Sequence, residues 1–113
     1  MNEENIILQY TFDFALQIIE YSDILKTMNK YNMINQLFRP GTSIGANVRE
    51  AQNAESRADF IHKMKIAAKV AGETEYWLLL CKHSHSYPTV DILLEKINAI
   101  EKILGKIIYS SKK

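Results

Sequence analysis

The sequence contains few of the residues on which turn-rich, disulfide-bonded or membrane-spanning folds depend. Its 113 residues include only 4 Gly and 2 Pro, too few for the many tight turns of a β-sandwich or barrel. The single cysteine, Cys81, cannot form an internal disulfide, which predicts a reducing, cytoplasmic environment. No apolar run reaches the roughly 18 residues of a membrane-spanning helix, so no membrane association is expected. The initial stretch MNEENIILQY lacks the basic start of a secretory signal.

An excess of charge of one sign is also missing. The chain has 14 Lys and Arg and 13 Asp and Glu, a formal net charge of +1. The distribution is uneven, because residues 1–55 carry 4 cations and 7 anions whereas residues 56–113 carry 10 cations and 6 anions. An asymmetry of this size does not by itself indicate a nucleic-acid-binding protein.

What the sequence does contain is helical periodicity, in four segments near residues 7–29, 32–53, 56–83 and 89–110. The residues expected to face the core are Phe14, Ile18, Tyr21, Leu25 and Met28; Ile34, Leu37, Gly41, Ile44, Val48 and Ala51; Phe60, Met64, Ala67, Ala71, Thr74, Leu78 and Cys81; and Leu93, Ile97, Ile100, Leu104 and Ile107. Only short polar breaks separate the segments, and short loops favour antiparallel neighbours. The sequence therefore predicts one all-α domain over residues 1–113, an antiparallel up-and-down four-helix bundle.

Local signals agree with these helix boundaries at two of the breaks. Ser56 followed by Asp59 indicates an N-cap with an acidic residue at the third helical position, and Thr89 is a second expected N-cap. The second segment is less regular, because Pro40 and two glycines lie inside its pattern. We expect a kink or a break near residues 39–43, and the alternative is a loop between two shorter helices.

No group of residues forms a convincing catalytic or metal site. Cys81, His83 and His85 share a C-x-H-x-H spacing, but the set straddles a helix end, so a buried cysteine beside a solvated loop is the simpler interpretation. Glu73 and Glu75 face different ways on a helix, and Glu73 is placed for an ordinary surface ion pair with Lys69. We therefore expect no catalytic residue, no metal and no cofactor, and a protein that acts by binding and not as an enzyme.

The third segment has more apolar surface than one bundle buries. Tyr76, Leu79 and Leu80 point away from its core-facing stripe, and Trp77 lies at the edge of that stripe. A contact between subunits, centred on Tyr76 and Leu80, is the functional interpretation. The alternative is a few scattered apolar residues of the kind that most protein surfaces carry.

The first half of the same segment carries a cluster of cations. Arg57, Lys63, Lys65 and Lys69 accompany one anion, Asp59, and Arg49 lies shortly before them. A surface that contacts the phosphates of RNA or DNA is one interpretation, and an ordinary solvated helix face is the other.

Two parts of the chain resemble a known family. The stretch GTSIGANVREA (residues 41–51) resembles the Ser-Ile-Pro-x-Asn-Ile-Ala-Glu-Gly segment of the bacterial four-helix bundle proteins that are encoded in intervening sequences of 23S rRNA genes. The stretches AESRADFIHKM (54–64) and AGETEYWLLL (71–80) look like the third helix of that family. By position, Asn47 and Glu50 correspond to the Asn and Glu of the family motif, whereas Gly45 stands where Pro is usual and Ala51 where Gly is usual.

The resemblance implies an up-and-down bundle that assembles as a homopentamer. It also implies kinship with accessory proteins of diversity-generating retroelements, which bind nucleic acid and a reverse transcriptase. Two hypotheses follow for this chain: an oligomeric bundle that binds structured RNA or DNA through the third helix, or a protein–protein scaffold or adaptor without a nucleic-acid role.

Overall fold

The chain folds into four long helices joined by short loops. The structure is a computed structural model that describes residues 3–112. The helices are α1 (Glu3–Thr27), α2 (Tyr31–Ala51), α3 (Arg57–His83) and α4 (Asp91–Ser111), and no strand occurs within that range. The prediction of an all-α fold is confirmed, with α1 beginning at Glu3, ahead of the predicted residue 7. None of the described helices combines the length and hydrophobicity needed to cross a membrane.

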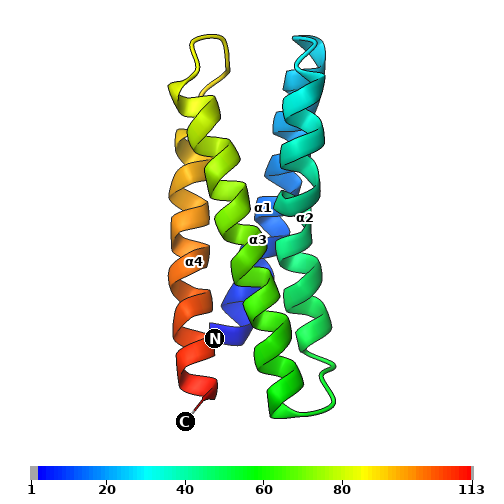
Figure 1. The fold of residues 1–113 in the computed structure, drawn as a ribbon, viewed down its shortest axis with the longest axis vertical. Helices are drawn as coiled ribbons and strands as arrows, with labels where there is room; N and C mark the ends of the chain where they lie inside the picture. Colours follow the sequence, from blue (N-terminus) through cyan, green and yellow to red (C-terminus); the bar gives the residue numbers. More distant parts are fainter. Residues whose placement is uncertain (1–2, 113) are drawn as a thin grey trace.

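The helices lie side by side along a body with a long axis of 45 Å (Figure 1). Each helix lies with its backbone close to two neighbours, in the order α1–α2–α3–α4 and back to α1, and diagonal helices meet through core side chains, as Tyr21 on α1 and Cys81 on α3 do. The loop after α1 meets the loop before α4, because Lys30 donates a hydrogen bond to Ser86 (2.8 Å) and lies 4.7 Å above the Tyr87 ring. The predicted antiparallel up-and-down topology is therefore confirmed.

The core is built from the four predicted stripes. The largest fully buried side chains, from all four helices, are Phe14, Ile7, Ile18, Leu25, Leu37, Ile44, Met64, Leu78, Ile97, Ile100, Leu104 and Val48. Ile34 and Phe60 are only half-buried at its edge. Met28 is 40% exposed, so its placement in the core was wrong. It lies just past the end of α1 at Thr27, where the chain has already left the helical path that carries Leu25 inward.

The start of α3 has the cap that the sequence predicts. The Ser56 hydroxyl accepts a hydrogen bond from the Asp59 backbone N–H at 3.0 Å. The Asp59 carboxylate in turn accepts from the Glu55 backbone N–H at 3.1 Å. Two backbone donors at the helix start are thus satisfied, which fixes the direction in which α3 leaves the loop.

The start of α4 differs slightly from the prediction. The N-cap residue is Val90 and not Thr89, although the Thr89 hydroxyl accepts a long hydrogen bond (3.3 Å) from the Asp91 N–H. Val90 is buried, and the Tyr21 hydroxyl donates to the Pro88 carbonyl at 2.8 Å. Burial is also the main cause that raises the pKa of Tyr21. Core contacts, and not the local cap, therefore decide where α4 begins.

Helix α2 runs without interruption through Pro40, so a break near residues 39–43, and the alternative of a loop between two shorter helices, are wrong, whereas the expected kink stays a prediction. Pro40 removes one backbone donor, but its ring is buried on the same stripe as Leu37 and Ile44. A break would turn one end of this stripe away from the core. The hydroxyl of Thr42 donates to the Phe38 carbonyl at 2.9 Å in the turn around the proline. Tertiary packing therefore outweighs the local preference for a break.

The two glycines of α2 bring it close to α1. A Cβ atom added to Gly41 would lie 2.9 Å from Cγ1 of Ile18, and one added to Gly45 would lie 3.3 Å from the backbone oxygen of Thr11. Both distances are shorter than ordinary van der Waals contact. The absence of side chains at these positions is what allows the α1–α2 spacing.

We expect Gly41→Val to lower the free energy of unfolding by about 1–3 kcal/mol, because the new side chain must displace Ile18 in a filled core. The matched control is Gly72→Ala in α3, where an added Cβ meets no atom within 4 Å. That control should raise stability by about 0.5–1 kcal/mol through helix propensity. Urea denaturation followed by circular dichroism measures both changes, and a stabilised Gly41→Val protein would contradict the proposed close approach.

Candidate interaction surfaces

The outward face of α3 divides into a basic half and an apolar half. Lys65 and Lys69 are exposed on the side of α3 opposite the buried Met64 and Ala71. Two turns further along the helix, the same side carries Tyr76. The outward face of α3 therefore carries both exposed lysines from the predicted cation cluster and an exposed aromatic residue from the predicted subunit contact.

The five cations expected to act together are spread over different sides of the bundle. Lys63 forms an ion pair with Asp59 at 2.9 Å. Arg49 lines a hollow between α1 and α2, whereas Arg57 lies beside the end of α4. Lys65 and Lys69, termed the basic pair, are exposed on the outward face of α3 and form no ion pair with any side chain that the structure describes.

The apolar half of the α3 face consists of Tyr76, Leu79 and Leu80, termed the α3 patch, which are 56%, 40% and 40% exposed. Trp77 borders this patch, packs partly against the core and meets the Tyr76 ring edge-on at 5.2 Å between centroids. The indole N–H of Trp77 points to the Glu73 carboxylate at 3.4 Å. Glu73 therefore faces Trp77, and the expected ion pair with Lys69 is not formed.

A second exposed apolar surface, on α1 and α2, was missed by the sequence interpretation. Phe12, Leu16 and Ile19 follow one another at helical spacing on α1 and are 52%, 46% and 39% exposed. Phe38 on α2 is 41% exposed and lies one turn before Thr42 on the side of α2 that faces α1. These four residues are termed the α1–α2 stripe. The sequence did contain a sign of it. In α1, Phe12, Leu16 and Ile19 recur at intervals of four and three residues, beside the core-facing residues that have the same spacing.

The α1–α2 stripe borders a hollow of about 130 Å³. Phe12 and Ala15 line it from α1, and Gly45, Ala46 and Arg49 line it from α2. Two small residues, Gly45 and Ala46, line it from α2, and the space at Gly45 is narrow, because an added Cβ would lie 3.3 Å from the backbone oxygen of Thr11. The exposed apolar side chains of the stripe therefore lie beside a small hollow in the surface.

The cysteine and histidine cluster does not converge. Cys81 is 1% exposed, and burial is the main cause that raises the pKa of its thiol. His83 and His85 are exposed at and beyond the end of α3. Over residues 3–112, no three or more His, Cys, Asp and Glu side chains are grouped so as to hold a metal ion. Cys81 thus serves as a small core residue.

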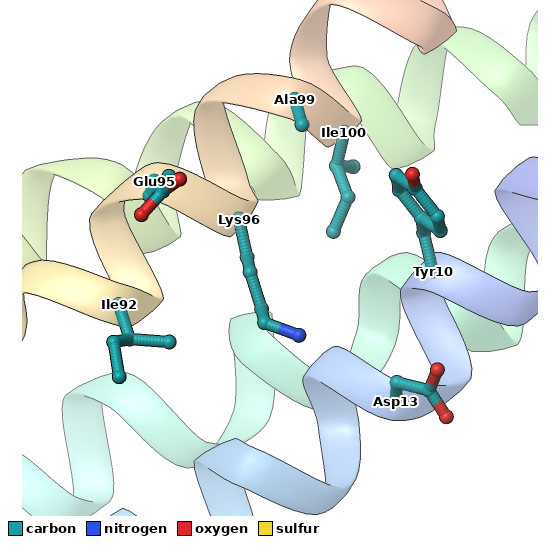
Figure 2. A pocket seen from close by; sticks show the side chains of 7 residues that line it. All are labelled: Tyr10, Asp13, Ile92, Glu95, Lys96, Ala99 and Ile100. Carbon is teal, nitrogen blue, oxygen red and sulfur yellow. The ribbon is translucent and has the colours of Figure 1, made fainter.

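A pocket of about 340 Å³ lies between α1 and α4 (Figure 2). Ile100 and the Tyr10 ring form an apolar part of its lining, and Lys96 extends from α4 across the gap toward α1. Two carboxylates, of Asp13 and Glu95, line the same pocket. A lining in which an ammonium and two carboxylates share one open surface does not select for one class of ligand.

The comparisons with known proteins agree with this geometry. The sequence model of the family described as 23S rRNA-intervening sequence protein matches residues 3–106, nearly the whole chain. The chain belongs to this family. It is also similar to the crystal structure of a protein of unknown function from the S23 ribosomal protein family of Bacteroides thetaiotaomicron VPI-5482, with a TM-score of 0.91 and 39% identity. That match covers 96% of this chain and 99% of the other, and no curated protein matches.

In this member of the family, the two motif residues of α2 lie near the end of that helix. Asn47 is half-buried, and its side-chain amide donates to the Ser43 carbonyl at 2.8 Å. Glu50 is exposed and faces Lys63 on α3. The hydrogen bond with Asp59 chiefly, and the attraction of Glu50 to a smaller extent, raise the pKa of Lys63. The Asn47 side chain therefore bonds within its own helix, and Glu50 contributes to the charge balance between α2 and α3.

Two carboxyl groups meet where α3 packs on α4 in this family member. Burial, followed by repulsion from Glu75 and a hydrogen bond with it, raises the pKa of Glu101 from 4.5 to about 7. Glu101 therefore binds a proton more tightly in the folded chain than in the unfolded chain. Its contribution to stability is complete below about pH 4.5 and is lost as the pH rises through 7.

We expect Glu101→Gln to raise the free energy of unfolding at pH 8 by about 1 kcal/mol, with allowance for the partly exposed position, and to have little effect at pH 4.5. Glutamine imitates the protonated carboxyl, so the gain appears only where the parent side chain is ionised. The control is Glu95→Gln, an exposed carboxylate on the same helix. Thermal unfolding at the two pH values tests this, and an equal change at both would contradict the shifted pKa.

Proposed function

We propose that this chain is a non-catalytic assembly module of the bacterial cytoplasm, a helical bundle that self-associates through the α3 patch. The observation that supports this most directly is the exposure of Tyr76, Leu79 and Leu80 together on one turn and a half of α3. Aromatic and leucine side chains gathered in this way, and not scattered, are typical of interface cores. The homopentamer implied by the family resemblance is the expected assembly, and it would serve as a scaffold for a further protein, such as a reverse transcriptase.

Replacing Leu80 by Asp should dissociate the assembly, because each contact would then bury an unpaired charge. Leu80 is 40% exposed in the single subunit, so the change is compatible with folding. The matched control is Ile92→Asp on α4, an apolar side chain that is 64% exposed and lies outside the α3 patch. Light scattering at micromolar concentration gives the mass of each protein. A monomeric parent would refute self-association, and an assembled Leu80→Asp protein would place the contact elsewhere.

Nucleic-acid binding is the second candidate function, supported by the basic pair. Lys65 and Lys69 are exposed one turn apart, with no ion pair among the described side chains. A single copy offers too few cations for more than weak, salt-sensitive binding. An assembly repeats the pair, so that one RNA or DNA molecule contacts several copies and gains affinity through avidity. Contacts of this kind go to phosphates and carry little sequence preference.

The double change Lys65→Glu and Lys69→Glu should weaken binding to structured RNA and duplex DNA by about tenfold or more at low salt. It should also flatten the dependence of log affinity on log salt, because fewer phosphate contacts release fewer counterions. Fluorescence anisotropy over a salt series measures both effects in a variant shown to keep its oligomeric mass. If the parent binds neither nucleic acid, or if the variant binds equally well, the scaffold function stands alone.

A further inference from the structure

The bundle exposes two separate apolar surfaces, on different pairs of helices. The α3 patch lies on the outward face of α3, whereas the α1–α2 stripe lies on α1 and α2, with Phe12 at the hollow between these two helices. The ring order of the helices places α1 diagonally across from α3 (Figure 1). No contact within one subunit therefore brings the two surfaces together.

We infer that the α1–α2 stripe is the surface that receives the α3 patch of a second copy, so that copies associate head to tail. This inference rests on the proposed self-association and specifies its partner surface. The contact would set Tyr76 and Leu80 of one copy against Phe12, Leu16 and Phe38 of the next.

The area of the α1–α2 stripe supports this pairing. Its four side chains are 39–52% exposed, which leaves on the order of 300 Å² of apolar surface uncovered. A patch of that size is at the level at which exposed apolar surface on a monomer is usually functional. It matches the apolar centre of a standard interface, in which each partner buries about 800 Å² with a polar rim.

Shape gives a second, independent reason. The hollow beside the stripe is lined by apolar and small residues, among them Ala15, Gly45 and Ala46, and by Arg49. Tyr76, the most exposed side chain of the α3 patch at 56%, is a ring with a polar tip. A projecting aromatic residue and a shallow apolar hollow are complementary, and a tyrosine ring fits an apolar lining that includes a polar group.

Charge favours a head-to-tail contact over a contact between two identical faces. Residues 1–55, which include α1 and α2, carry 4 cations and 7 anions, and residues 56–113, which include α3 and α4, carry 10 cations and 6 anions. A symmetric contact between two α3 patches would bring two positive halves together and leave both α1–α2 stripes in water. Head-to-tail packing joins halves of opposite sign and covers both apolar surfaces with one kind of contact.

The test uses two full-length variants, each lacking one surface. Leu80→Asp removes the α3 patch and keeps the stripe, and Leu16→Asp removes the stripe and keeps the α3 patch. Leu16 is 46% exposed, so the charge is compatible with the folded subunit; circular dichroism checks this, and Phe12→Asp replaces the variant if it unfolds. Ile92→Asp is the control, with an exposed apolar residue outside both surfaces.

We expect each variant to be monomeric alone and an equimolar mixture of the two to form a dimer of one copy of each. Every copy in the mixture retains one intact surface, and the two intact surfaces differ, so growth stops at two. Light scattering after size-exclusion chromatography gives the masses, and a fluorescent label on one variant identifies the mixed dimer.

Two outcomes would overturn the inference. If the parent and the Leu16→Asp variant are both assembled, the stripe is not part of the contact, although self-association through the α3 patch stands. If both variants are monomers that fail to combine, the two surfaces do not meet each other. A parent that is itself monomeric refutes the proposed self-association first and this inference with it.

Discussion

A helix in a four-membered ring has only two neighbours, so its outward side must be left in solvent or covered by another molecule. The described residues of this chain follow that rule, because the backbone of each helix lies close to two others, and diagonal helices meet through core side chains such as Tyr21 and Cys81. The core occupies the inward stripe of each helix, from Ile7 on α1 to Ile107 on α4. An apolar residue on an outward side is therefore not buried by the fold itself. Most of these exposed apolar residues lie on α1 and α3, among them Phe12, Leu16 and Tyr76.

Features that depend on local chemistry could be predicted from the sequence. The Ser56 cap needs only the hydroxyl and the N–H of Asp59 three residues later, so its signal is contained in a few positions. The stripe on α4 is similarly unambiguous, because its apolar residues, among them Ile97 and Leu104, recur at one helical spacing and all are buried. Propensity and tertiary packing agree at these sites, which makes the local pattern sufficient.

Features that depend on the neighbouring helix could not be predicted in this way. Pro40 and Gly41 indicate a break when α2 is considered alone, but in the bundle Pro40 is buried and Gly41 admits Ile18 of α1. The ion pair of Lys63 with Asp59 is different, because the two residues lie four apart on α3, so its spacing was available in the sequence. The α1–α2 stripe has the same spacing as the core stripe beside it, so the pattern of α1 alone does not show that Phe12 and Leu16 would remain in solvent.

The outward face of α3 combines two chemistries that assembly would keep apart in space. Lys69 precedes Tyr76 by seven residues, which places about 10 Å of helix between the basic pair and the α3 patch. If a second copy covers the α3 patch, the basic pair lies at the rim of that contact, where a lysine keeps its hydration and its charge. Self-association would then leave the basic pair of each copy exposed, so that one pair lies beside every contact between copies. The proposed phosphate binding would therefore depend on assembly, because the cations of a single bundle are too few and too widely spread to act without it.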